Sequence, residues 1–104
     1  MNCKWLSGAV PETVMLYMVI ERFKNREPIP VYRRFREKGR MMPQGLNYVE
    51  SWVEINFDRC FQLMECEDAQ LLEEWAANWR DLVELEFVPV RTSKLASEVI
   101  APKL

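Results

Sequence analysis

The chain has 104 residues, enough for one domain with a single hydrophobic core. Hydrophobic residues make up 49% of it, which is typical of a globular protein and excludes a disordered chain. A formal net charge of -2 gives no general attraction to nucleic acid or to an anionic membrane surface. The chain contains no histidine, so it lacks the commonest general base, metal ligand and haem ligand. We therefore expect no metal and no cofactor.

The three cysteines, Cys3, Cys60 and Cys66, are an odd number and form no CxxC motif. Cys60 and Cys66 lie six residues apart in one predicted strand, too far to bridge at about 3.3 Å per residue. Acidic neighbours disfavour their thiolate forms, so we expect inert thiols in a reduced, cytoplasmic protein. No apolar run reaches about 18 residues and no secretory signal is recognisable, so no membrane partner is predicted.

Residues 1–13 read as an N-terminal extension, because Gly8 and Pro11 interrupt any regular pattern. Trp5 and Leu6 are isolated apolar residues that we expect to dock on the domain or on a neighbouring chain. Met15 is an alternative natural start, so residues 1–14 need not belong to the natural protein.

Residues 14–20, VMLYMVI, form an unbroken apolar run, which is typical of a central strand covered on both faces. A polar connection over residues 22–27 follows. Pro28 and Pro30 then open a helix that Gly39 ends. The apolar side of this helix is made of Val31, Tyr32 and Phe35.

Two further strands are predicted over residues 46–54 and 59–66 as a hairpin. In the first, alternation places Leu46, Tyr48 and Trp52 on one face and Val49 and Val53 on the other. In the second, Phe61 and Leu63 face one way, and Cys60, Gln62 and Met64 face the other.

A second helix is expected to begin with Asp68 as its N-cap. Its apolar stripe recurs at helical spacing in Leu71, Leu72, Trp75, Ala76, Trp79 and Leu82. The last strand, residues 83–90, contains Pro89 and should lie at a sheet edge. The C-terminal tail, residues 93–104, can form a short helix from Ser93.

This element order is βαββαβ, and right-handed crossovers turn it into a ferredoxin-like α+β domain over residues 14–92. We predict a four-stranded antiparallel sheet with both helices on one face and the first and third strands in the centre. The other face lacks a cover, although the first strand is apolar on both sides. We expect a homodimer in which two sheets stack face to face. The alternative is that the terminal segments fold over the open face.

A group of aromatic and polar side chains can converge on one sheet face if the register permits. This mixture suits a pocket for a small hydrophobic ligand. Glu50 is the candidate catalytic base, provided that desolvation raises its pKa. The alternative is an ordinary dimer core with a paired glutamate at its rim. The candidate ligand-binding residues are Tyr17, Tyr48, Trp52, Gln62 and Met64.

Arg33, Arg36 and Arg40 share one face of the first helix, and arginine suits oxyanions. A solvated face is the simpler interpretation, because the second helix is acidic. The same βαββαβ order occurs in RNA-recognition modules, but these need stacking aromatics and a glycine-bearing basic motif on the third strand. That strand reads RCFQLMEC, so we expect no nucleic-acid partner.

The segments MLYMVIERF, WVEINFDRCFQLMEC and LLEEWAANWRDLVELEFVPV resemble an uncharacterised bacterial family of short domains of unknown function. The resemblance covers about residues 15–92 and is most specific around Trp75, Trp79, Asp81, Leu82 and Phe87. It implies membership of the dimeric α+β barrel, ferredoxin-like superfamily, and so implies the fold and the dimer. Relatives there include cofactor-free monooxygenases, haem-degrading enzymes, lactone isomerases and stress-response proteins. Haem-degrading members use a histidine that this chain lacks, and no catalytic residue can be carried over.

Two hypotheses stay open at this point. The first is a homodimer of unknown role that binds a small hydrophobic ligand between its sheet and its partner. The second is a cofactor-independent enzyme, monooxygenase-like or isomerase-like, that acts on a small aromatic compound through Glu50 or a tyrosine.

Overall fold

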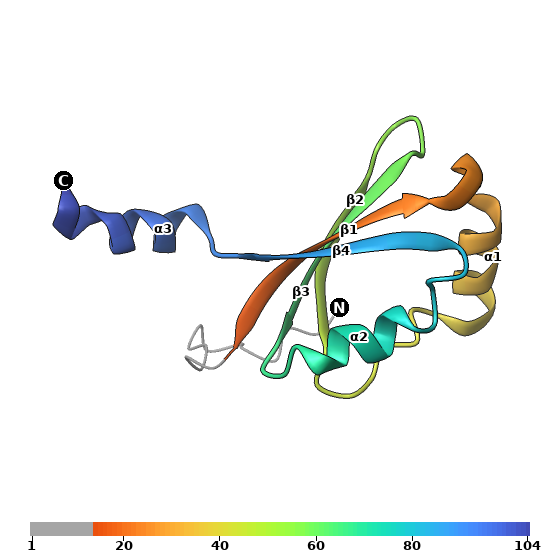
Figure 1. Cartoon of the computed structure of the whole chain (residues 1–104), viewed down its shortest axis with the longest axis horizontal. Helices are drawn as coiled ribbons and strands as arrows, with labels where there is room; N and C mark the ends of the chain where they lie inside the picture. The colour runs from red at the N-terminus through yellow and green to blue at the C-terminus, as the bar shows by residue number, and fades with distance from the viewer. Residues whose placement is uncertain (1–13) are drawn as a thin grey trace.

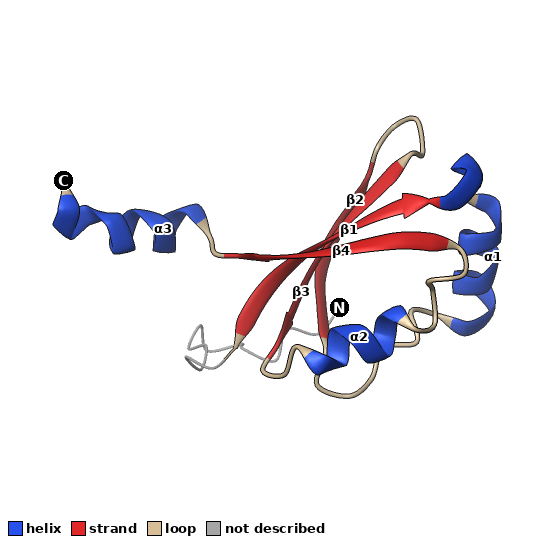
Figure 2. Cartoon of the chain, viewed as in Figure 1, coloured by secondary structure: helices blue, strands red, loops and turns tan. Residues whose placement is uncertain are grey.

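The computed structural model of the protein describes residues 14–104, so the expectations for Trp5 and Leu6 lie outside the described residues. The elements follow one another in the predicted order, with a third helix after the last strand (Figures 1 and 2). Their bounds are β1 Met15–Phe23, α1 Ile29–Lys38, β2 Asn47–Val53, β3 Arg59–Cys66, α2 Gln70–Ala76, β4 Val83–Val90 and α3 Ser93–Ile100. Single 3₁₀ turns, η1 Lys24–Arg26 and η2 Ala101–Lys103, follow β1 and α3.

The four strands form one antiparallel sheet in the order β2-β3-β1-β4. This is the ferredoxin-like α+β arrangement that the element order predicts. The central position of the first and third strands is confirmed, and so is the edge position of the strand that contains Pro89. Pro89 lies opposite Tyr17 on this edge strand, where a residue without an N–H is tolerated because one side of the strand has no neighbour in the sheet.

The core lies between one face of the sheet and α2. Val19 and Met64 from the central strands are fully shielded from solvent, and Leu72 and Trp75 of α2 pack against the same core. The apolar stripe of the second helix is therefore confirmed. The N-cap of α2 is Ala69, one residue after the predicted Asp68. The Asp68 carboxylate nevertheless accepts a hydrogen bond from the N–H of Gln70 at 2.9 Å, so it satisfies a donor of the first turn.

The regular part of α2 is short, and tighter turns continue it as far as Leu82. The N–H of Asn78 donates to the carbonyl of Trp75 at 3.0 Å, and the N–H of Trp79 donates to that of Ala76 at 2.9 Å. These three-residue steps rotate the chain so that Trp79 stays on the buried side next to Trp75. The two rings together form a broad apolar lid over the sheet.

The first helix contains no buried residue, although Val31 packs partly buried against the core. Gly39 adopts a φ of 68°, and its N–H donates to the carbonyl of Phe35 at 2.7 Å, which confirms the predicted C-cap. Arg34 forms a double hydrogen bond with Asp81, at 2.8 and 2.7 Å, which joins α1 to the segment after α2. This contact is the attraction between basic and acidic segments that the charge pattern indicates.

Two predictions about the strands are wrong. β1 continues past residue 20 to Phe23, so Arg22 and Phe23 belong to the strand and not to a polar connection. In β2 the register shifts between Tyr48 and Glu50, which is the mark of a β-bulge. The extra residue places Ser51 opposite Gln62 and Trp52 opposite Phe61, so Tyr48 and Trp52 point to opposite faces.

We expect Leu72→Ala to destabilise the protein by about 2–5 kcal/mol, because Leu72 is buried between α2 and the sheet. The matched control is Leu71→Ala, which removes the same atoms from a partly buried neighbour and should cost clearly less. Urea denaturation of the two variants measures both values. Equal losses would contradict the packing of α2 described here.

Candidate functional site

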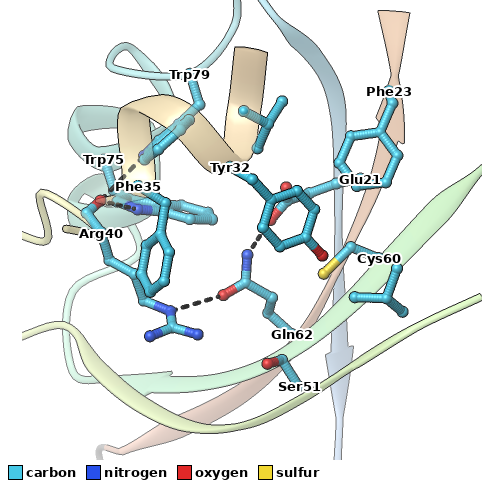
Figure 3. Close-up of a pocket in the computed structure, with 12 residues that line it drawn as sticks. Glu21, Phe23, Tyr32, Phe35, Arg40, Ser51, Cys60, Gln62, Trp75 and Trp79 are labelled. Carbon is cyan, nitrogen blue, oxygen red and sulfur yellow. Dashed lines mark hydrogen bonds between the residues drawn. The ribbon is translucent and has the colours of Figure 1, made fainter. Parts of the chain in front are cut away.

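A cavity of about 130 Å³ lies between the helix-covered face of the sheet and the two helices α1 and α2 (Figure 3). Most of its wall is apolar and aromatic. Its polar groups come from three different strands and from the residue that follows the C-cap of α1. The apolar wall is formed by Phe23, Val31, Tyr32, Phe35, Val53, Trp75 and Trp79, and the polar groups are Glu21, Arg40, Ser51, Cys60 and Gln62.

Glu21 is the most unusual of these residues, because it carries a carboxyl group into the covered face of a central strand. It lies between Cys60 and Leu85 in the sheet and is only 5% exposed. Gln62 on β3 donates a hydrogen bond from its Nε2 to the Glu21 carboxyl group. Burial raises the pKa of Glu21 to about 7, although the Gln62 hydrogen bond and the Arg40 charge lower it. Glu21 therefore populates both protonation states near neutral pH.

Gln62 links Glu21 to Arg40. Its Oε1 accepts a hydrogen bond from Arg40 Nε at 3.3 Å, so Arg40, Gln62 and Glu21 form a continuous chain along the cavity (Figure 3). The Arg40 guanidinium carbon lies 3.7 Å from the centre of the Tyr48 ring and 5.0 Å from that of Phe35. None of the ion pairs within residues 14–104 involves Arg40, so its charge is held by two aromatic faces and an amide.

Two tryptophans fix the backbone of Arg40. Trp75 Nε1 and Trp79 Nε1 both donate to the Arg40 carbonyl oxygen, at 2.9 and 3.0 Å (Figure 3). Asn78 between them donates to the carbonyl of Met41 at 3.1 Å. The buried indole N–H groups are thus satisfied, and the loop after α1 is tied to α2. The same rings supply the apolar wall and set the position of the only arginine in the cavity wall.

The cysteines contribute no nucleophile. Cys60 lines the cavity, and burial, together with the negative charge of Glu21, raises the pKa of its thiol to about 12. Burial also raises the pKa of the Cys66 thiol. Both are free thiols, and the prediction that they cannot bridge is confirmed. Cys3 lies outside the described residues.

The structure separates the ligand-binding residues that the sequence predicts. Tyr17, Met64 and Tyr48 lie side by side across three strands on the helix-covered face, and Gln62 lines the cavity on the same face. Met64 is fully buried in the core. Trp52 lies on the opposite face and is 52% exposed, so it does not join the group.

Glu50 does not have the environment that a catalytic base requires. It is exposed on β2, and its Oε1 accepts a hydrogen bond from the N–H of the following residue, Ser51, at 3.0 Å. The desolvation on which its predicted role depends is therefore missing. The structure places the desolvated carboxyl group at Glu21 instead.

Glu21 was not among the predicted site residues, because the unbroken apolar run that indicates the first strand ends at residue 20. A signal was nevertheless present, because Tyr17, Val19 and Phe23 continue a two-residue alternation through Glu21. An acidic residue at a position that this alternation predicts to be buried is a candidate for a perturbed pKa. The sequence indicated the role of Arg40 less clearly, because it grouped Arg40 with Arg33 and Arg36. Only the tertiary fold separates Arg40 from these two arginines and places it in the cavity wall.

The Glu21 carboxyl group should make stability depend on pH. Between about pH 4.5 and about 7 the folded state binds more protons than the unfolded state, so stability falls as pH rises through this window. The expected loss from pH 5 to pH 8 is roughly 2–3 kcal/mol. The chain has no histidine, so no ordinary side chain changes charge in the middle of this range.

Glu21→Gln should abolish most of this loss, because a neutral amide keeps a hydrogen-bonding group next to Gln62 and has no proton to release. Urea denaturation at pH 5 and pH 8 measures the effect. Glu50→Gln is the matched control at an exposed position and should retain the wild-type dependence. A wild-type protein that is equally stable at both pH values would contradict a desolvated Glu21.

Comparisons with known proteins leave the activity unassigned. Neither the curated proteins nor the solved structures contain a match. Within residues 14–104 no three side chains suited to metal binding gather, and no helix there has the length and apolar character to cross a membrane. One protein family matches residues 15–104, which is nearly the whole chain and includes α3. The chain belongs to the family described as domain of unknown function DUF3303.

Proposed function

We propose that this protein binds a small aromatic or hydrophobic molecule in the cavity between its sheet and helices, and that Glu21 exchanges a proton with this molecule. The observation that carries the proposal is a carboxyl group with a pKa of about 7 in the wall of a mostly apolar cavity. Pockets of this composition, with few converging polar groups and a perturbed pKa, are typical of ligand sites.

The size of the cavity limits the ligand. Pockets for drug-sized ligands have volumes of roughly 300–1,000 Å³, whereas the volume of this cavity is about 130 Å³. A single ring with one or two small substituents is therefore the expected size class. Such a ring would lie among Tyr32, Phe35 and Trp79, where aromatic faces favour offset or edge contacts.

The polar groups indicate where a proton and a charge would go. Ionised Glu21 can accept a proton from an acidic O–H or C–H group of the ligand, which leaves the ligand with one additional negative charge. Arg40, at the other end of the Gln62 link, is the cation available to stabilise that charge. A pKa of about 7 is close to the optimum for a base that must take up and release a proton near neutral pH.

An isomerase-like enzyme without a cofactor is the second candidate function. A single base can remove a proton from one carbon of a substrate and return it to another, so Glu21 alone can supply the chemistry. Because one base such as Glu21 is sufficient for isomerisation, we favour this reaction over the monooxygenase-like alternative. Glu21 takes the role for which Glu50 was the sequence-based candidate.

We also propose that the protein is a homodimer formed through the open face of the sheet. Trp52 is exposed there, and the apolar side chains around it are only partly buried. α3 does not cover this face, because it lies beyond the end of the sheet (Figure 1). A second sheet stacked on this face would bury the apolar patch. The patch consists of Leu16, Met18, Ile20, Trp52, Phe61, Leu63, Val88 and Val90.

Binding is tested with a panel of single-ring phenols, carboxylic acids and cyclic ketones, measured by the shift of the thermal melting temperature. We expect at least one class to stabilise the wild type, and Glu21→Gln to weaken that stabilisation and remove its pH dependence. Glu50→Gln serves as the control and should bind like the wild type. A panel without any binder, or a binder that is indifferent to Glu21→Gln, would contradict the proposed site.

The dimer is tested by Leu63→Glu, which places a charge in the middle of the open face. Analytical ultracentrifugation at micromolar concentration should find a wild-type dimer and a monomeric variant with an unchanged circular dichroism spectrum. Val88→Lys on the edge strand is a second variant in case Leu63→Glu fails to fold. Ile55→Glu is the control, because Ile55 is 99% exposed in the turn between β2 and β3 and should leave the dimer intact. A monomeric wild type would overturn the proposal.

A further inference from the structure

The C-terminal helix is separated from the rest of the domain. β4 is paired with β1 up to its last residue, Val90, and two residues, Arg91 and Thr92, lead from there into α3. Figure 1 shows α3 at the far end of the molecule, with the sheet between it and the helices α1 and α2. Among the elements of residues 14–104, α3 makes extensive contact only with the 3₁₀ turn that follows it, η2.

This isolated helix has a distinct apolar side. Leu95 and Val99 lie four residues apart, one above the other on the helix, and Ile100 lies beside Val99. They are 52%, 53% and 48% exposed, and α3 contains no buried residue. The opposite side carries Lys94, Ser97 and Glu98. Such a pattern is typical of a helix that packs its apolar side on another surface.

An eight-residue helix does not persist alone in water. Isolated helices shorter than about 12–15 residues are marginal even in favourable sequences, and most helical stability in proteins comes from packing. The start of α3 is nevertheless well defined, because Thr92 Oγ1 accepts a hydrogen bond from the N–H of Leu95 at 3.2 Å. The family match also extends through this segment to residue 104. Packing against a surface outside this chain would supply the missing stabilisation.

We propose that α3 packs its apolar side on a second copy of the chain, so that two protomers exchange C-terminal arms. The inference rests on the proposed homodimer. Val88 and Val90, the last open-face residues of β4, lead directly into the arm, so the apolar surface is continuous with α3. Figure 1 shows α3 projecting from the end of β4, away from α1 and α2, which cover the opposite face of the sheet.

Two other occupants of this apolar surface are less favoured. The two-residue link leaves α3 beyond the end of the sheet, where it makes no extensive contact with β1–β4, α1 or α2 within residues 14–104. An anionic membrane would favour a clear excess of cations, but residues 93–104 carry only two lysines, Lys94 and Lys103, against Glu98. A second copy is the partner that accounts for both the open face and the arm.

The exchange is tested by a photoreactive benzoylphenylalanine at position 99 in a mixture of unlabelled and ¹⁵N-labelled protein that has been denatured and refolded together. Irradiation should give cross-linked peptides of mixed isotopic mass, which form only between two chains. The same group at position 97, on the polar side, is the control and should give few cross-links. A dimer that forms no cross-links from position 99, or forms them only within one chain, overturns the exchanged arm and leaves the dimer standing.

A wild type that sediments as a monomer overturns both proposals. A second measurement uses Val99→Glu, which we expect to raise the dimer dissociation constant by about tenfold or more. Lys94→Glu is its control on the polar side and should change the constant little. An unchanged dimer dissociation constant for Val99→Glu would contradict packing on a second copy. Binding of the wild type, but not of Val99→Glu, to vesicles that contain anionic phospholipid would contradict it as well.

Discussion

The Arg40 carbonyl oxygen is the point on which the described architecture depends. It accepts hydrogen bonds from two buried indoles, Trp75 and Trp79, and so ties the segment after α1 to α2. The two indole rings pack their apolar faces against the sheet. Their N–H groups would be unsatisfied when buried, and they donate instead to the backbone of the loop after α1. One interaction therefore closes the core and sets the position of the Arg40 side chain.

The candidate site is a consequence of this arrangement. Once Arg40 is fixed, its guanidinium lies on the Tyr48 ring and donates to Gln62, which in turn holds Glu21. The carboxyl group is buried in the wall of a cavity that both tryptophans also line, and this burial raises its pKa to about 7. A purely structural core would gain more from an apolar residue at this position, since burying a carboxyl group is costly. An ionisable group beside unfilled space points to function rather than packing.

Local patterns in the sequence were sufficient for the order of the strands and helices, but not for the end of β1 or the bulge in β2. The stripe through Leu72 and Trp75, the edge position of Pro89 and the hydrogen bond of Asp68 to the first turn of α2 each follow from spacing or from one residue's chemistry. The site was harder to predict, because it depends on the register and on contacts between distant residues. A single bulge in β2 moved Trp52 to the opposite face, and the Arg40 hydrogen bond to Gln62 joins residues 22 positions apart. Neither effect leaves a local pattern in the sequence.

The proposed function depends on the protonation state of the Glu21 carboxyl group, and this state can be measured directly. Selective ¹³C labelling of glutamate side chains, with Glu21→Gln to assign the signal, allows the carboxyl carbon of Glu21 to be titrated by NMR. The account predicts a midpoint near pH 7, well above the ordinary value of 4.5 for glutamate. A midpoint close to that ordinary value would show that water reaches the carboxyl group, and would contradict the proposed site.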